Sequence, residues 1–238
     1  MWIADAVRVP SPPALLELLD ARERARHDSL VRERDRALYL TAHALLRQVV
    51  AGQLGGRARE VRFTHVCRNC DRPEPHGKPG LVGSPLEVSL SHSGDRVAVA
   101  LSLAGPVGVD IEQVAREVVD LPEVVLAAPE RAELERFPAA ERPRAFTRYW
   151  ARKEAVLKAT GDGLMVNPAL LTVSAPGAPA ALLEWRERAE PHRPVRLHDV
   201  DAGDGYRAAV AVLGDGCRVV RHEVGYGGDG TLGRPRRG

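Results

Sequence analysis

Residues 106–113 read PVGVDIEQ, an apolar run that becomes acidic at Asp110 and Glu112. The run predicts a strand, and successive side chains on a strand point to opposite faces. Asp110 and Glu112 therefore share one face, with their backbones about 6.5 Å apart. Two carboxylates at this spacing repel each other unless a positive group lies between them. The alternative interpretation is an edge strand whose acidic face is hydrated.

A third acidic position of interest lies in residues 146–158, FTRYWARKEAVLK. The pattern predicts a helix on which Trp150, Glu154 and Lys158 share one face at i, i+4 and i+8. Lys153 lies one residue before Glu154. The simpler interpretation is an amphipathic helix with a Glu154–Lys158 pair on its surface.

Together the two elements predict a site of three carboxylates, if they meet in space. An all-oxygen, highly charged site suits a hard cation such as Mg²⁺, or Mn²⁺ in its place. Lysines beside such a site suit a ligand that carries phosphate. The residues therefore indicate a magnesium-dependent site for phosphoryl-type transfer, with the ligands Asp110, Glu112 and Glu154.

A serine-rich stretch, SLSHSG at 89–94, lies at the expected end of another strand. His92 is placed to donate to a phosphate oxygen, and Ser91 to assist it. The alternative is a turn whose serines make local hydrogen bonds. A Ser–His nucleophile pair is disfavoured, because adjacent residues on a strand point to opposite faces.

The composition limits the classes of protein. The chain has 238 residues, with 34 basic against 32 acidic side chains, and this balance argues against a general nucleic-acid binder. The first 30 residues lack a positively charged start and a long apolar run, so we expect no signal peptide, no membrane span and a cytoplasmic protein. Three cysteines argue against a disulfide scaffold.

The hydrophobic pattern predicts an α+β protein in which helices precede short antiparallel strands, twice over. Accordingly we expect one half over residues 1–104, a second over 105–224, and a disordered tail over 225–238, which has few apolar residues. Gly52 suits the end of the second helix. Helices are predicted at 14–30, 32–52, 129–137 and 142–160, and strands at 61–65, 86–91, 96–103, 107–112, 170–175, 181–188, 194–200, 206–213 and 217–224.

Four motifs in the same order resemble those of the Sfp-type 4′-phosphopantetheinyl transferases. They are GKP at 77–79, SLSHSG at 89–94, VGVDIE at 107–112 and WARKEAVLKATGDGL at 150–164. The resemblance runs from about the first helix to the last strands. It implies a pseudo-twofold fold of two similar halves, each a small antiparallel sheet packed by helices. It also implies a monomer that binds coenzyme A in the cleft between the halves.

The same resemblance implies roles for individual residues. Asp110, Glu112 and Glu154 match the ligands of Mg²⁺. Other basic and polar residues match contacts to coenzyme A: Lys78, Ser91, His92 and Lys158, with Lys153 beside the site and Arg26 directed to the 3′-phosphate.

The implied reaction transfers 4′-phosphopantetheine from coenzyme A to a serine of an apo acyl or peptidyl carrier protein. Adenosine 3′,5′-bisphosphate is released. The cation held by Asp110 stabilises the charge that builds on the pyrophosphate. Glu154, or a metal-bound water, takes the serine proton, and Lys158 neutralises or protonates the leaving phosphate.

Two other functions are open from the sequence. The same carboxylates suit a Mg²⁺-dependent phosphatase or nuclease, with water as the acceptor. Cys67 and Cys70, with His65 and His76 nearby, suit half of a zinc site. With the RPRRG tail, this half-site is compatible with a zinc-knuckle nucleic-acid module. A single C-x₂-C favours reduced thiols over structural zinc.

Overall fold

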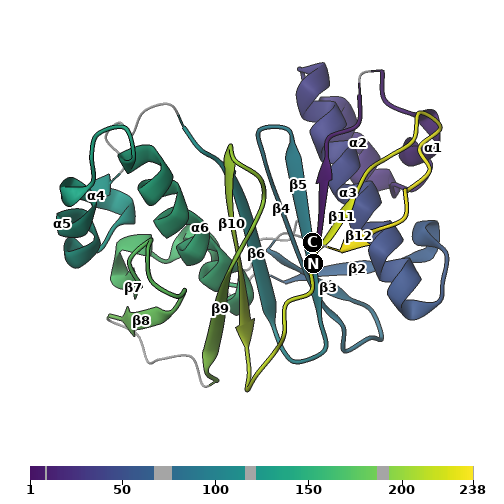
Figure 1. Cartoon of the computed structure of the whole chain (residues 1–238). Helices are drawn as coiled ribbons and strands as arrows, with labels where there is room; N and C mark the ends of the chain where they lie inside the picture. Colours follow the sequence, from purple (N-terminus) through teal and green to yellow (C-terminus); the bar gives the residue numbers. More distant parts are fainter. Residues whose placement is uncertain (9, 67–76, 116–121, 187–192, 238) are drawn as a thin grey trace.

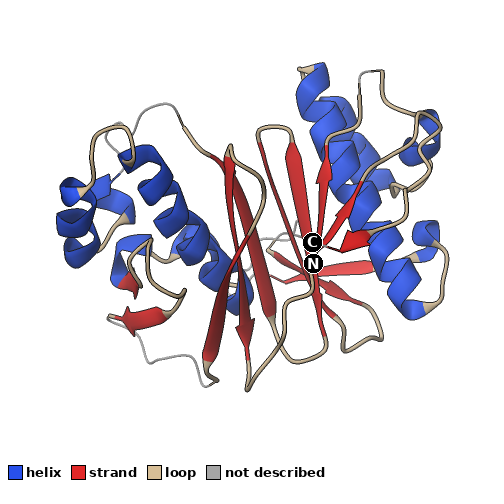
Figure 2. Ribbon diagram, in the orientation of Figure 1, coloured by secondary structure: helices blue, strands red, loops and turns tan. Residues whose placement is uncertain are grey.

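A computed structural model describes residues 1–8, 10–66, 77–115, 122–186 and 193–237. It has four layers, helix, sheet, sheet and helix (Figure 1). Two sheets stand side by side in the middle of the molecule, and a long helix covers the outer face of each (Figure 2).

The first half of the chain builds one helix layer and most of one sheet. A long helix packs on the sheet, and a two-stranded ribbon lies beside it. The elements are β1 (Trp2–Asp5), α1 (Pro13–Leu16), α2 (Ala21–Ser29), α3 (Glu33–Leu54), β2 (Phe63–Val66), β3 (Lys78–Leu81), β4 (Glu87–Ser93) and β5 (Arg96–Ser102).

The second half repeats this plan. Its long helix packs on a three-stranded sheet, and another two-stranded ribbon follows the helix. The elements are β6 (Val107–Gln113), α4 (Pro122–Val125), α5 (Ala128–Arg136), α6 (Arg142–Thr160), β7 (Leu171–Val173), β8 (Leu182–Trp185), β9 (Val195–Val200) and β10 (Tyr206–Leu213), followed by β11 (His222–Val224) and β12 (Arg236–Arg237).

The strand orders show how alike the two halves are. The first sheet contains the order β1-β5-β4, and the second has the order β6-β10-β9. In the first half, β1 pairs with β5, and β5 pairs with β4. In the second half, β6 pairs with β10, and β10 pairs with β9 in the same way. All these pairs are antiparallel. The predicted pseudo-twofold α+β fold of two similar halves is therefore confirmed.

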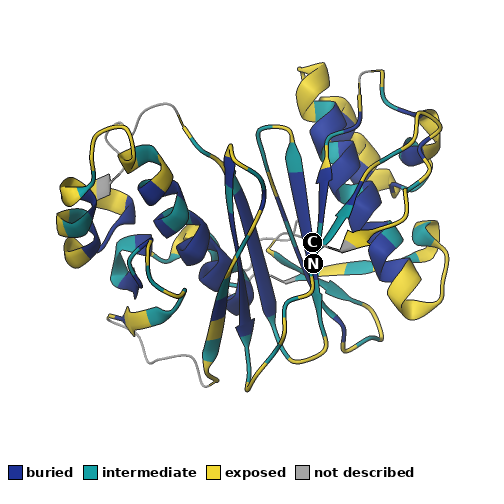
Figure 3. Cartoon of the chain, viewed as in Figure 1, coloured by how far each residue is buried: buried dark blue, intermediate teal, exposed yellow. Residues whose placement is uncertain are grey.

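The core lies in three layers between these elements (Figure 3). Between the sheets, Ile3 and Ala98 face Val109, Ile111 and their neighbours. The apolar faces of α3 and α6 cover the outer sides of the two sheets. Because core layers lie on both sides of β10, this strand is apolar on both of its faces.

Local signals account for the helix ends. The side chain of Asp20 accepts a hydrogen bond from the Glu23 N–H, and Glu23 accepts from the Asp20 N–H. This capping box starts α2, so the predicted helix over 14–30 is two helices. Helix α3 ends at Gly55, in the left-handed region at φ 74°, and not at the predicted Gly52.

The C-terminal segment corrects two predictions. Strand β11 pairs in parallel with β1, so residues 222–224 belong to the first sheet and not to the second half. The tail is not disordered over its described residues: β12 pairs with β11, and Tyr226 Oη donates to Gln48 Oε1 at 2.6 Å. The reason is that β1 has an open edge, which the returning chain covers.

Among the described residues, none of the helices has the length and apolar character that crossing a lipid bilayer requires.

Candidate active site between the two halves

The three predicted carboxylates line one pocket. Asp110 and Glu112 come from β6 and Glu154 from α6, and the pocket has a volume of about 350 Å³. Residues of β4 complete it from the other half of the chain. The remaining lining residues are Leu90, Ser91, His92, Trp150, Lys158 and Leu164.

A glycine allows β6 and α6 to approach closely enough to form this pocket. A Cβ at position 108 would overlap the backbone of Ala155 and Ala159 on α6. Gly108 and Asp110 share a face of β6, so the approach brings Asp110 beside the same helix. Position 108 of the strand therefore requires glycine, because any side chain there would overlap α6.

Asp110 is the most buried of the three carboxylates, with 1% of its surface exposed. Its Oδ1 accepts hydrogen bonds from Lys158 Nζ at 2.6 Å and from Ser91 Oγ at 2.8 Å. Its Oδ2 is buried and has no partner in the described part of the chain. One oxygen is therefore held in place while the other is left to bind something else.

Glu112 is held by two donors. Ser93 Oγ donates to its Oε2 at 2.7 Å, and Trp150 Nε1 donates to its Oε1 at 3.1 Å. Burial and the neighbouring charge of Asp110 raise the pKa of Glu112, and these two hydrogen bonds act in the opposite direction. Trp150 packs against the core of the second half, and its indole N–H also orients this carboxylate.

Glu154 is buried, and its Oε1 has no partner among the described residues. Burial raises its pKa to about 7, helped by the charges of Asp110 and Glu112 and opposed by Lys158. The carboxylates therefore destabilise one another's ionised forms. A bound cation would relieve this repulsion.

In their present positions, no three His, Cys, Asp or Glu side chains of the described residues are arranged to hold a metal ion. The donor set nevertheless fits a hard cation. It consists of carboxylate oxygens, two of which are buried without a partner, Asp110 Oδ2 and Glu154 Oε1. The geometry therefore brings the predicted ligands together but leaves them short of a closed coordination shell.

His92 lies at the mouth of this pocket and is exposed. Loss of hydration against the pocket wall and the positive charge of Lys158 lower the pKa of His92. The ring is therefore neutral near pH 7 and donates through one nitrogen only.

A second pocket of about 430 Å³ adjoins the first and shares Leu90, Lys158 and Leu164 with it. Its walls are mostly apolar, including Phe63 and Met165. The polar residues around it are Glu23, His43, His65, Lys78, Ser89, Lys158 and Asp162. An apolar chamber that opens onto a charged one suits a ligand with a flat ring at one end and phosphates at the other.

Lys78, from the GKP motif, lines the second pocket. Its Nζ donates to Ala159 O at 3.0 Å and lies 3.2 Å from Glu87 Oε2. It therefore joins β3 to the last turn of α6, next to Lys158.

Two predicted contacts lie elsewhere. The predicted placement of Lys153 beside the cofactor is wrong: its ammonium is fully buried and pairs with Glu130 Oε2 at 2.6 Å. On a helix, residues 153 and 154 point about 100° apart, so only one faces the pocket. Arg26 is exposed on α2 and lines neither pocket. Arg22, one turn earlier, reaches the pocket residue His65, with Nη1 3.3 Å from Nδ1.

The proposed zinc half-site falls outside the described residues, since Cys67, Cys70 and His76 lie within 67–76. His65 is described, and it belongs to β2 beside the second pocket.

Three alternate serines of β4 form the seam between the halves. Ser89 Oγ accepts from the Val109 N–H at 3.0 Å, and Ser93 Oγ accepts from the Gln113 N–H at 3.1 Å. Between them Ser91 donates to Asp110. Two of the hydroxyls thus accept hydrogen bonds from backbone N–H groups on the open edge of β6. The alternation of serines in SLSHS is the sequence signal for these contacts.

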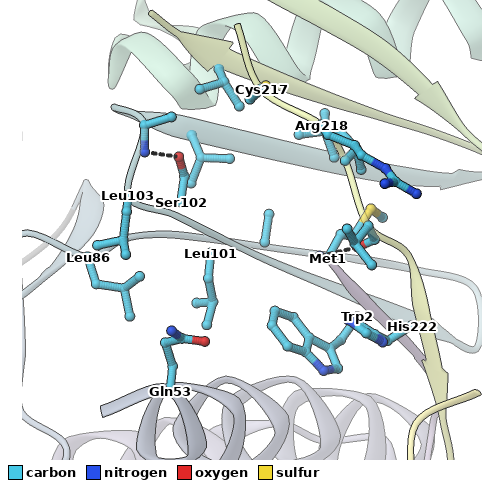
Figure 4. Close-up of a pocket in the computed structure, with 17 residues that line it drawn as sticks. Met1, Trp2, Gln53, Leu86, Leu101, Ser102, Leu103, Cys217, Arg218 and His222 are labelled. Carbon is cyan, nitrogen blue, oxygen red and sulfur yellow. Dashed lines mark hydrogen bonds between the residues drawn. The ribbon is translucent and has the colours of Figure 1, made fainter. Parts of the chain in front are cut away.

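A further pocket, of about 310 Å³, lies toward the first residues of β6 and is unlike the site (Figure 4). Trp2, Leu86, Leu101 and Leu103 line it, and no carboxylate does. It therefore lacks the carboxylates that would hold a hard cation, and its basic lining residues are Arg218 and His222.

Comparison with known proteins places the chain in a family. The family model of the 4′-phosphopantetheinyl transferase superfamily matches residues 106–211. The Synechocystis protein slr0495 is 32% identical over 170 residues, which cover 69% of this chain and 65% of that protein. The 4′-phosphopantetheinyl transferase HetI of Nostoc is 30% identical over 212 residues, 85% of this chain and 81% of HetI.

Shorter matches have the same name. AcpT of Salmonella typhi is 45% identical over 92 residues, 36% of this chain and 46% of AcpT. Among solved structures, the holo-[acyl-carrier-protein] synthase of Thermotoga maritima is 21% identical, with a TM-score of 0.38 over 52% of this chain and 69% of the synthase. On the likeness to HetI, which spans more than four fifths of both chains, together with the family match across β6 and α6, the chain belongs to the 4′-phosphopantetheinyl transferase superfamily.

Proposed function

We propose that this protein transfers the 4′-phosphopantetheine group of coenzyme A to a serine of an apo acyl or peptidyl carrier protein. The observation that carries the proposal is the pocket in which Asp110, Glu112 and Glu154 meet beside Lys158. One chain suffices, because both halves line it, and we propose that the protein acts as a cytoplasmic monomer.

The two joined pockets suit the two ends of coenzyme A. The apolar chamber with Lys78 and His65 takes the nucleotide end, and the charged chamber takes the pyrophosphate. Lys158, His92 and Ser91 lie where the phosphates would pass. Lys158 and His92 offer hydrogen-bond donors, and Ser91, whose hydroxyl donates to Asp110, holds that carboxylate in place.

Asp110, Glu112 and Glu154 would hold Mg²⁺, or Mn²⁺ in its place. When bound, the cation neutralises charge that builds on the pyrophosphate. The two buried oxygens without partners, Asp110 Oδ2 and Glu154 Oε1, are the atoms that this role needs.

In the transfer step, the serine oxygen of the carrier forms a bond to the β-phosphorus of coenzyme A. The bond from that phosphorus to the bridging oxygen breaks, and adenosine 3′,5′-bisphosphate leaves with the electron pair. Glu154 takes the serine proton, since its carboxylate lies in the pocket and its Oε1 has no other partner among the described residues. Lys158 neutralises the charge on the leaving phosphate.

The test is to incubate the protein with coenzyme A, Mg²⁺ and an apo carrier and to weigh the carrier by mass spectrometry. The expected result is a gain of one phosphopantetheine group, which EDTA or Asp110→Ala abolishes. An unchanged carrier mass with active reagents would contradict the proposal. Steady hydrolysis of coenzyme A without any carrier would instead identify a Mg²⁺-dependent phosphatase.

A further inference from the structure

Lys153 occupies a cage of oxygen atoms inside the second half. Its Nζ donates to the carbonyl oxygens of Val125 at 3.0 Å, Pro168 at 2.9 Å and Leu171 at 2.6 Å. The fourth neighbour is Glu130 Oε2, at 2.6 Å. The side chain is fully buried, so the ammonium is closed off from both pockets.

Glu130 extends this arrangement to further backbone. Its Oε2 accepts from the Ala127 N–H at 2.7 Å, which closes the first turn of α5. Its Oε1 accepts from the Val173 N–H at 2.8 Å, on β7. The Lys153–Glu130 pair therefore ties α4, α5, β7 and the segment before β7 to the middle of α6.

The first half contains a counterpart of this pair. Glu23 lies in the first turn of α2, a nine-residue helix like α5, and it also closes a capping box. The buried Arg47, in the middle of α3, donates from Nε to Glu23 Oε2 at 2.7 Å and from Nη1 to the carbonyl of Val61. Each half thus joins its short helix to its long helix through a buried glutamate and a buried cation.

Lys153 is connected to the site through the chain on either side of it. Glu154 is the next residue on α6 and points into the charged pocket. After α6 the chain turns through Gly161 and Gly163, both at positive φ, and Leu164 lines both pockets. The chain then reaches Pro168, whose carbonyl binds Lys153. The segment that forms the pocket rim is therefore held at both ends, by α6 itself and by Lys153.

We propose that Lys153, together with Glu130, is a positioning residue that sets the rotation of α6 and the path of residues 161–168. It thereby presents Glu154 and Leu164 to the ligand without contacting the ligand itself. This inference rests on the proposed function, since it names a residue that serves the same site.

The choice of lysine supports this role. The chain has only three lysines among 34 basic residues, at positions 78, 153 and 158. Arginine therefore supplies almost all of the positive side chains of this protein, and lysine is used at few positions. A compact ammonium fits four oxygens arranged around one point, whereas a planar guanidinium does not. Arg47, by contrast, binds through separate nitrogens, as its shape requires.

The experiment compares Lys153→Met, Lys153→Arg, Glu130→Gln and the double variant Lys153→Met/Glu130→Gln with the wild-type protein. Exposed Arg136, on a surface ion pair, supplies the control Arg136→Lys. Melting temperature, kcat, KM for coenzyme A and the Mg²⁺ concentration for half-maximal rate are measured at a temperature where every variant is folded.

We expect Lys153→Met to lower Tm by roughly 10 °C, because it leaves a buried carboxylate unpaired. Lys153→Arg behaves in the same way, although it keeps the charge. The double variant recovers much of the lost Tm, since neither charge remains. Its kcat nevertheless stays down by about tenfold or more and its Mg²⁺ requirement stays raised, because the carbonyl contacts that place Glu154 are gone.

Two results would overturn the inference. If kcat and the Mg²⁺ requirement of the double variant return to wild-type values with Tm, the pair serves stability alone. If Lys153→Met raises KM for coenzyme A at unchanged Tm, the lysine contacts the ligand. If the wild-type protein transfers no phosphopantetheine, the proposed function fails. The positioning role of Lys153 is then tested by measurements that do not depend on transfer. Mg²⁺ binding by calorimetry and amide exchange at residues 163–167 then supply the readout, and both must change in the double variant.

Discussion

Lys158 Nζ lies 2.6 Å from Asp110 Oδ1 and so joins helix α6 to strand β6 at the center of the pocket. The same ammonium also donates to Ser91 Oγ of β4, in the first half of the chain, at 2.9 Å. One cation thus connects three elements and both halves of the chain. Its side chain is 28% exposed, so an incoming phosphate can reach it.

Removal of the positive charge of Lys158 tests its role in transfer. We expect Lys158→Met to lower kcat by about 10²- to 10³-fold, since a donor aimed at developing charge is lost. Initial rates of carrier modification by mass spectrometry measure the effect. The exposed Arg136→Met variant, which also loses one positive charge, should keep its rate. A Lys158→Met rate within threefold of wild type would exclude a role for Lys158 in stabilising the charge on the leaving phosphate.

Glu154 makes the stability of the metal-free protein depend on pH. Its pKa is raised from 4.5 to about 7, so the folded state binds a proton more tightly than the unfolded chain does. The resulting stabilisation is fully present below pH 4.5 and is lost as pH rises through 7. We expect Glu154→Gln to be more stable than wild type by about 3 kcal/mol at pH 8 and by little at pH 5.

Urea denaturation in EDTA at the two pH values measures this difference. Glu135→Gln, an exposed change on α5, is the matched control. Equal gains for Glu154→Gln at both pH values would show that the Glu154 carboxyl titrates normally in the folded protein.

Cation binding should release a proton from the same carboxyl. At pH 7 Glu154 is about half protonated, and a cation between the carboxylates favours the ionised form. Calorimetric titration with Mg²⁺ in two buffers of different ionisation enthalpy therefore gives a proton release that Glu154→Gln removes. Identical heats in both buffers for the wild-type protein would contradict this coupling.

Gly108 is expected to tolerate no side chain. Gly108→Ala places a methyl group against the backbone of Ala155 and Ala159, and neither helix backbone nor strand can move away cheaply. We expect a loss of about 3 kcal/mol or more, or failure to fold. Gly56→Ala, with nothing within 4 Å of the new methyl, is the control and should cost under about 1 kcal/mol. A Gly108→Ala protein of wild-type Tm would show that β6 and α6 are farther apart.

The C-terminal segment should contribute to the stability of the first half. Tyr226→Phe removes the hydrogen bond to Gln48 and should cost about 1 kcal/mol. Deletion of residues 225–238 should cost more, because it also uncovers the apolar residues beneath Leu232. Both are measured by thermal unfolding. If the deletion leaves Tm unchanged, the tail does not pack on α3.

The sequence predicted the long helices and most of the strands, though not β1 or β3, because the signals of the predicted elements are local. The apolar spacing of α3 and α6 and the alternation in β6 lie within single elements. Glycines at the helix ends report positive φ at Gly55 and Gly161. The motif order indicated the family, which the comparisons confirm.

The failures have a common physical origin. Tail composition predicted disorder, yet β12 in the tail pairs with β11, which itself pairs with β1 at the other end of the chain. Lys153 and Glu154 are neighbours in the sequence, yet one binds backbone carbonyls in the core and the other faces the pocket. Nothing in a single sequence says which side of α6 meets which surface.

By itself, the sequence determined which residue types were available: three carboxylates, three lysines and alternate serines. Only the tertiary structure decided that these groups meet, through the close approach of α6 at Gly108 and the serine contacts from β4 to β6. The physical reason is that the cost and gain of bringing charges together depend on distance and burial, and both arise from contacts between segments far apart in the chain.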